Sequence, residues 1–425
     1  MYYNGSNHYW FNHCIQCFNN PLIVLESGVN SFFEMPKRGL FISLVMLSMV
    51  LCSCKDKEPD IPRWVTTPYT IEIPPYFPTQ LNIPDNNPMT VEGIALGRFL
   101  FYDGRLSGRT ECDSLMSCGS CHVQANNFRP GTGNPAFPEG MPIGIKGVPT
   151  SHAALPLVNL VWNQNGYTWN GSVAALAGAS YTGSIESIVL HTIVHPAELA
   201  GDTAQTVALI QSIDGYPELF YKAFGSTKVT ANRIAMAIAQ FVRTLISANS
   251  RFDKYMRGDV QLTTEELEGF ILFTTEEGAD CFHCHGSSGN PMFTTNLFYN
   301  NGKDSVFDGS DDRYSITASV ADIGAYKATT LRNITAGGPF MHDGRFRTLD
   351  EVVNFYSHEV KMSEHISPLM HHVANGGIQL TPIEKNNLKA FLQSLTDEEF
   401  LNNQLFSAPD VFPDGKEYIE VKGRY

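Results

Sequence analysis

The chain has 425 residues, of which 43% are hydrophobic and 17% are charged, and its formal net charge is -14. This length is sufficient for two sizeable domains, and the hydrophobic fraction is typical of a folded protein rather than a disordered one. The acidic balance, without any long basic run, excludes a typical nucleic-acid-binding protein, so no nucleic acid is expected as a partner.

A short apolar run is the first informative feature along the chain. A Lys-Arg pair precedes the apolar stretch 39–52, and the polar, proline-rich sequence KDKEPDIPRW follows it. The run is too short for a comfortable transmembrane helix and predicts a signal peptide over residues 35–53. Its end, LCSC, resembles the lipobox of bacterial lipoproteins, which predicts Cys54 as a lipid anchor to the membrane. Residues 1–34 would then precede the true start, and the protein is expected to be exported, as a periplasmic or outer-membrane lipoprotein facing the periplasm or the cell surface.

The rest of the chain has mainly helical patterns. A proline-rich linker is expected over residues 54–86. Apolar residues at helical spacing or N-terminal capping signals mark the following segments: a stretch ending at Asp103, residues 202–224, residues 230–250, and helices that begin near Thr263, Thr348 and Thr381. Strand signals are few. We therefore expect a mostly α fold with long loops and few strands.

Four of the nine cysteines belong to two Cys-x-x-Cys-His motifs. The first motif is Cys118-x-x-Cys121-His122, and the second motif is Cys281-x-x-Cys284-His285. This pattern is the attachment signature of c-type haem. Two cysteines one helical turn apart form thioethers to the two vinyl groups, and the adjacent histidine binds the iron. The sequence therefore predicts two haems c.

Other uses of these cysteines fit less well. A zinc site needs four donors, which the two motifs could supply together, but zinc modules usually keep their halves close in sequence. A thioredoxin-like redox pair would need a strand-to-helix context that neither motif has. Behind the leader only Cys112 stands outside the motifs, and it is either a reactive thiol or a buried bystander.

The order of the motifs resembles the bacterial di-haem cytochrome c peroxidases and their MauG-type relatives. The resemblance runs from about Asn87 to Pro409 and rests on LPLVNLVWNQNGYTWNGS, HPAELAG, TLRNITAGGPFMHDGRFRTLDEVVNFY and LTPIEKNNLKAFLQSLTDEEF. It implies two cytochrome c-like domains, each with one covalent haem c. Residues 87–257 would form the N-terminal peroxidatic domain and residues 258–409 the C-terminal electron-transfer domain, with a tail over 410–425.

The resemblance also implies roles for individual residues. His122 is similar to the proximal ligand of the peroxide-reacting haem, and His285 to that of the electron-relaying haem. Trp169 matches the tryptophan that bridges the two haems. Glu198 matches the distal glutamate, a group that moves a proton between the two oxygens of peroxide. No second histidine ligand is expected at the first haem, because His152 does not fall in the loop that supplies one.

The sixth ligand of the second haem separates two subgroups of the family. Tyr356 stands where the peroxidases carry methionine and the MauG-type proteins carry tyrosine. A phenolate stabilises oxidised iron and lowers its potential, whereas a thioether raises it. Met341 and Met362 lie close in sequence, so a thioether ligand stays open, although neither methionine has the register.

The region before Glu198 departs from the family pattern. Ile188 replaces a usual glutamine, Thr192 replaces a proline, and LAGASYTGS is inserted after the bridging tryptophan. His191 or His195 is a candidate for the missing polar group, with a purely structural histidine as the alternative.

The resemblance implies a calcium site between the haems, and only some of its usual ligands are recognisable in this sequence. The usual asparagine ligand is missing, with Ala153 nearest to its position. The carbonyls of Gly337 and Pro339 are left as candidate ligands for one Ca²⁺.

The resemblance implies two candidate functions. The favoured one is reduction of hydrogen peroxide at the N-terminal haem, with electrons relayed through the C-terminal haem from a small electron-donor protein. The alternative is a MauG-type oxidase that uses peroxide to oxidise Trp or Tyr residues of a dedicated protein substrate. A pure electron-transfer cytochrome is disfavoured by Glu198. A homodimer is compatible with the resemblance.

Overall fold

The computed structural model describes residues 64–417 apart from 112–114, 133, 135–136, 138, 173–182 and 288. The expected signal peptide, the expected lipid anchor Cys54, the leftover thiol Cys112 and most of the expected insertion lie outside the described residues. From Val65 onward the chain belongs to a single unit. Within the described part, none of the helices combines the length and the apolarity that a membrane crossing requires.

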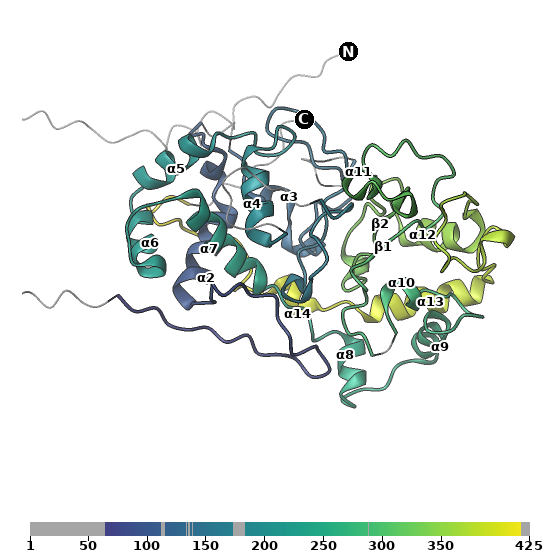
Figure 1. The fold of residues 1–425 in the computed structure, drawn as a ribbon. Coiled ribbons are helices and arrows are strands. Elements are labelled where there is room, and N and C mark those ends of the chain that lie inside the picture. The colour runs from purple at the N-terminus through teal and green to yellow at the C-terminus, as the bar shows by residue number, and fades with distance from the viewer. Residues whose placement is uncertain are drawn as a thin grey trace, which may run out of the picture. The chain divides into compact units, whose positions relative to one another are not determined.

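The longer helices of the first half pack around one apolar core. They are α2 (Val91–Tyr102), α4 (Ile185–Val194), α5 (Thr203–Ser212), α6 (Tyr216–Phe224) and α7 (Ala231–Arg243). Helix α7 contacts α2 and α4 (Figure 1). At Gly97 of α2, a Cβ atom would lie 1.9 Å from the carbonyl oxygen of Ala237. Only glycine permits this approach of two helix backbones.

A second apolar core lies between α9 (Thr264–Phe273) and α13 (Pro382–Ser394), which run side by side (Figure 1). A glycine again permits the close approach of the two helix backbones, because a Cβ atom at Gly269 would lie 1.9 Å from the carbonyl oxygen of Asn387. Phe273 and Phe391 pack in this core with ring centroids 5.1 Å apart. The segment from Phe400 to Phe412 returns to the first core.

The remaining helical elements are short, and two of them carry parts of the Cys-x-x-Cys-His motifs. They are η2 (Gly104–Ser107), α3 (Cys118–Cys121), η4 (Gln124–Asn126), η5 (Leu160–Trp162), α8 (Arg251–Met256), α10 (Phe282–His285), α11 (Tyr314–Thr317), η6 (Val320–Asp322), η7 (Ile334–Ala336), α12 (Leu349–Asn354), the π-helix η8 (Phe355–Glu359), η9 (Val373–Asn375) and α14 (Glu398–Asn402). Among the described residues the one sheet joins β1 (Phe298–Tyr299) to β2 (Tyr326–Lys327), antiparallel, with Tyr299 opposite Tyr326. The expectation of a mostly α fold with few strands is confirmed.

Local signals predicted helix starts better than helix ends. Capping boxes at Thr263, Thr348 and Thr381 open α9, α12 and α13 as expected. The single helix expected over residues 202–224 is wrong, because the chain turns at Gly215, where φ is 85°, and forms α5 and α6 instead. The helix expected over 230–250 ends at Arg243.

Candidate functional site

The second motif presents its histidine as a neutral ligand. Cys281 directly precedes α10, and Cys284 lies one turn further along. The Nδ1 atom of His285 lies 3.1 Å from the carbonyl oxygen of Thr329. A carbonyl only accepts, so Nδ1 carries the proton and Nε2 keeps its lone pair. Desolvation lowers the pKa of His285 to about 4, which keeps the ring neutral at physiological pH.

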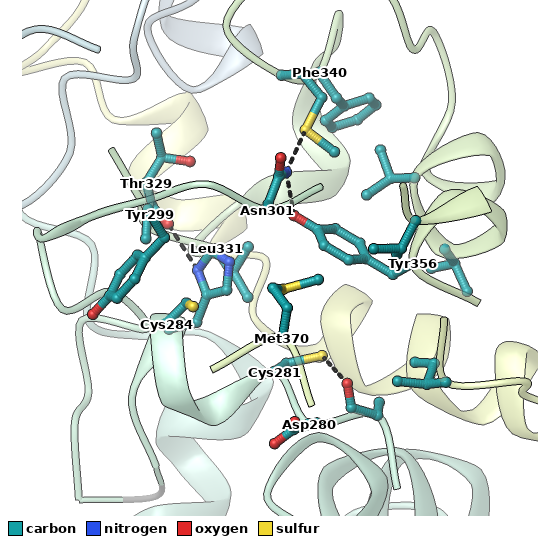
Figure 2. A pocket seen from close by; sticks show the side chains of 18 of the residues that line it. Asp280, Cys281, Cys284, Tyr299, Asn301, Thr329, Leu331, Phe340, Tyr356 and Met370 are labelled. Atoms are coloured by element: carbon teal, nitrogen blue, oxygen red, sulfur yellow. Dashed lines mark hydrogen bonds between the residues drawn. The ribbon is translucent and has the colours of Figure 1, made fainter. Parts of the chain in front are cut away.

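The second motif faces a cavity of about 200 Å³. Cys281, Cys284 and His285 line it together with Tyr356, and its wall is mainly apolar. Figure 2 shows Tyr356 and Asn301 extending into the same pocket as the two cysteines. Desolvation raises the pKa of the Cys284 thiol to about 12. An apolar cavity with two neutral thiols, one neutral imidazole and one phenol fits an apolar macrocycle that carries a metal. A zinc site shared by both motifs would require residues of the first motif in this cavity, and none of them lines it.

Tyr356 lies on η8, and irregular helical turns of this kind often occur at functional sites. Asn301 Nδ2 donates to the phenol oxygen of Tyr356 at 2.9 Å and also lies 3.7 Å from Met341 Sδ. Desolvation raises the pKa of Tyr356, and the bond from Asn301 opposes that rise. Met362 is 56% exposed. Met370, which the sequence did not single out, lines the cavity and is visible in Figure 2.

The first motif has the same ligand arrangement. A capping box between Ser117 and Ser120 begins α3. The Nδ1 atom of His122 lies 2.7 Å from the carbonyl oxygen of Phe128, so its Nε2 also keeps a lone pair. Desolvation lowers the pKa of His122. Both motifs therefore hold a neutral imidazole in a fixed orientation.

Glu198 lies close enough to the first motif to act on it electrostatically. Desolvation, with a second contribution from the Glu198 charge, raises the pKa of Cys118 and of Cys121 to about 12. The Glu198 carboxylate lies 3.4 Å from His195 Nδ1 and 4.0 Å from His191 Nδ1, and the two imidazole rings are 4.7 Å apart. Both candidate histidines are thus beside the carboxylate. The glutamate side chain is 31% exposed, so a small molecule can reach it.

Trp169 lines the cavity of the second motif. Its Nε1 donates to the carbonyl oxygen of Ala153 at 2.8 Å, which fixes the indole plane. Its ring packs edge-on against His342, with centroids 6.3 Å apart, and His342 stacks on Tyr326 at 3.5 Å. His152 packs edge-on against both of these rings. The sequence did not indicate this aromatic cluster, because its members come from separate segments.

The carbonyl groups of Gly337 and Pro339 have a cationic partner within the chain. Arg129 Nη1 donates to Gly337 O at 2.7 Å, and Nη2 donates to Pro339 O. Burial lowers the pKa of Arg129 to about 10, which leaves the guanidinium charged at neutral pH. A calcium ion on these two carbonyls would therefore meet a positive charge that already occupies one acceptor position on each oxygen. No sequence pattern linked Arg129 to these carbonyls.

Two Cys-x-x-Cys-His motifs in a mostly helical fold, one near a carboxylate and one near a phenol, define a c-type cytochrome with catalytic groups. The family model for di-haem cytochrome c peroxidase matches residues 91–261. Methylamine utilization protein MauG of Methylophilus methylotrophus is 30% identical over 319 residues, which cover 75% of this chain and 86% of that protein. Cytochrome c551 peroxidase of Nitrosomonas europaea is 32% identical over 283 residues, covering 66% and 75%.

A solved structure agrees with these relatives. The crystal structure of a MauG-like protein associated with microbial copper homeostasis superimposes with a TM-score of 0.67 at 31% identity, and the match covers 80% of this chain and 99% of that one. The chain therefore belongs to the di-haem cytochrome c peroxidase family, which includes MauG. Membership implies two haems c and confirms the prediction of a peroxidase-type oxidoreductase.

Proposed function

We propose that this protein reduces hydrogen peroxide at the haem bound by the first motif, and that the haem bound by the second motif relays electrons from a small donor protein. The observation that carries this proposal is the position of Glu198 beside the first motif. When bound, the haem iron supplies the redox chemistry that splits the O–O bond. Residues 87–257 and 258–409 are the proposed domains for the two haems, with His122 and His285 as the proximal ligands.

Glu198 is the proposed acid-base group. Its carboxylate takes the proton from one oxygen of peroxide and returns it to the other, so that the departing oxygen leaves as water. His195 Nδ1 lies 3.4 Å from this carboxylate, is buried, and has no hydrogen-bond partner among the described residues. His191 lies 4.0 Å from the carboxylate and belongs to the last turn of α4, and His195 is the C-cap of that helix. We infer that the histidine pair orients the carboxylate in place of the missing glutamine.

Trp169 is the proposed link between the two haem sites. It follows the first motif in the chain and lines the cavity of the second. The bond from its Nε1 to the Ala153 carbonyl oxygen holds the ring in one orientation against His342. A fixed aromatic ring between two redox groups is suited to electron transfer.

A MauG-type oxidation of Trp or Tyr residues on a dedicated protein substrate is the second candidate function. The observation that favours it is the Tyr356 phenol in the cavity of the second motif. Asn301 donates to this oxygen at 2.9 Å, and such a donor favours the phenolate form, which binds oxidised iron. The two relatives carry the two names, one MauG and one peroxidase.

Three further features complete the proposal. Export as a lipoprotein anchored through Cys54 is proposed on the pattern of the leader sequence alone. Calcium on Gly337 and Pro339 stays a prediction that competes with the Arg129 guanidinium for the same carbonyls. A homodimer also stays a prediction.

The test of the main proposal is peroxide-dependent oxidation of a reduced small cytochrome c by the haem-loaded protein. Glu198→Gln keeps the size of the side chain but removes the base, and we expect the peroxide step to slow by about 10²–10⁴-fold. Glu218→Gln is the matched control, because Glu218 lies on the exposed surface of α6 and pairs with Lys222 on the same helix. If Glu198→Gln retains the wild-type rate, Glu198 is not the acid-base group.

A further inference from the structure

A group of potential metal ligands lies beside the second motif and has no role in the proposed reaction. Glu276, His283 and His371 each offer one ligand atom, and these atoms lie within 4.8 Å of one another. The pair His283 Nε2 and Glu276 Oε1 is already 3.5 Å apart. For comparison, tetrahedral zinc with bonds of 2.0–2.1 Å places its ligand atoms about 3.4 Å apart.

A single carboxylate fixes both histidines. Asp280, whose side chain is only 5% exposed, accepts from His283 Nδ1 at 2.6 Å and from His371 Nδ1 at 3.1 Å. Because an ionised carboxylate only accepts, both Nδ1 atoms carry protons. Each Nε2 then keeps its lone pair for a metal. Metal-binding histidines almost always have such a partner on their second nitrogen.

The two segments that supply the ligands are held together without a metal. His372 Nε2 donates to the carbonyl oxygen of Glu276 at 2.9 Å. The rings of His283 and His371 pack nearly perpendicular to each other, with centroids 5.0 Å apart. Asp280 has a φ of 52°, a left-handed conformation that Asp tolerates better than most residues. Little rearrangement is therefore needed to complete a site.

We propose that Glu276, His283 and His371 bind one divalent transition-metal ion of the zinc and copper class. Two imidazoles and one carboxylate suit these ions, whereas calcium and magnesium prefer oxygen ligands alone. Three protein ligands leave a fourth position for water. Glu276 is 61% exposed and His371 is 40% exposed, so the ion can enter from solvent.

The site adjoins the second motif. Asp280 directly precedes Cys281, and both Asp280 and His371 line the cavity that Tyr356 enters. A bound dication would therefore stabilise the reduced, less positive form of a nearby redox group. Its binding should raise the reduction potential of the haem held by the second motif, a readout separate from peroxidase activity.

The experiment uses the haem-loaded protein without a histidine tag, after treatment with a chelator. Zn²⁺ is titrated by calorimetry, and Cu²⁺ by electron paramagnetic resonance, in which imidazole nitrogens give a resolved splitting. We expect one ion per chain. His371→Ala and Glu276→Gln should weaken binding at least tenfold, and Asp280→Asn, which keeps the left-handed backbone, about 10–100-fold. His358→Ala is the control, because its imidazole lies 3.0 Å from Gln379 instead.

Equal Zn²⁺ affinity in the wild type and in His371→Ala, or no saturable binding, would overturn the proposal and leave the cluster as a network of ion pairs. Saturable binding of Ca²⁺ with the same affinity as Zn²⁺ would overturn it too. Haem content is measured in every variant, so a folding defect is visible. If His371→Ala loses haem, the test is decided by Glu276→Gln instead, because Glu276 is exposed and lies outside the motif.

Discussion

Replacement of Tyr356 by Phe tests the feature that separates the two candidate functions. The change removes only the phenol oxygen, which accepts from Asn301 at 2.9 Å. Among the described residues, Asn301 Nδ2 then keeps the contact of 3.7 Å with Met341 Sδ. An amide group left without a good acceptor in such a cavity costs about 1–3 kcal/mol in the free energy of unfolding. That cost arises whether or not Tyr356 binds iron.

The visible spectrum distinguishes the two cases. If Tyr356 is the sixth ligand, Tyr356→Phe should change the spectrum of the second haem and raise its potential, because an anionic donor is lost. Tyr299→Phe is the matched control, since Tyr299 lines the same cavity but pairs with Thr295 Oγ1 at 3.0 Å. Haem content should stay at two per chain in both variants.

The opposite result identifies a thioether. If Tyr356→Phe leaves the spectrum unchanged while Met341→Leu or Met370→Leu alters it, the ligand is a methionine, because both residues line the cavity. The MauG-type function would then lose its supporting observation, and peroxide reduction would be the candidate function that is left.

The remaining predictions concern the haems and the buried charges. Intact mass and haem-stained gels should show two covalent haems, and Cys281→Ala combined with Cys284→Ala should leave one; zinc in place of haem iron would contradict the family assignment. The oxidised protein should bind cyanide promptly at the first haem, and a requirement for prior reduction would instead indicate a second histidine ligand there. Asp253→Asn should destabilise the protein by about 3–5 kcal/mol in denaturant unfolding, because Asp253 pairs at 2.6 Å with the fully buried Arg332. Desolvation by itself would raise the pKa of Asp253, but the hydrogen bonds from Arg332 and its charge outweigh that effect. The pKa of Asp253 therefore lies below its ordinary value of about 3.9. The stabilisation is therefore complete only above about pH 5, where the carboxyl is ionised in the unfolded chain as well, and disappears as the pH falls through the lower folded value; an unfolding free energy without this acid loss in the wild type would contradict the assignment.

The sequence by itself predicted the features that depend on local spacing. The two haem attachment motifs are readable because both cysteines and the histidine must lie within one helical turn of each other. The capping boxes at Thr263 and Thr348 are readable for the same reason, since the reciprocal bonds join residues three apart. The helix expected to run to residue 250 ends at Arg243, and long-range contacts hold part of the backbone that follows it. The Asp397 carboxylate accepts from the backbone of Ala248 and Asn249, which offers these groups partners outside a helix.

Only the tertiary structure decided which distant side chains meet. Tyr356 was located by register, but its partner Asn301 lies 55 positions earlier and no local pattern links the two. Arg129 reaches the Gly337 carbonyl across 208 positions, which places a guanidinium where sequence reasoning expected calcium. Asp280 meets His371 across 91 positions. Such contacts arise from the packing of helices and loops around the cavities, where a buried charge or polar atom must find a partner wherever in the chain it lies.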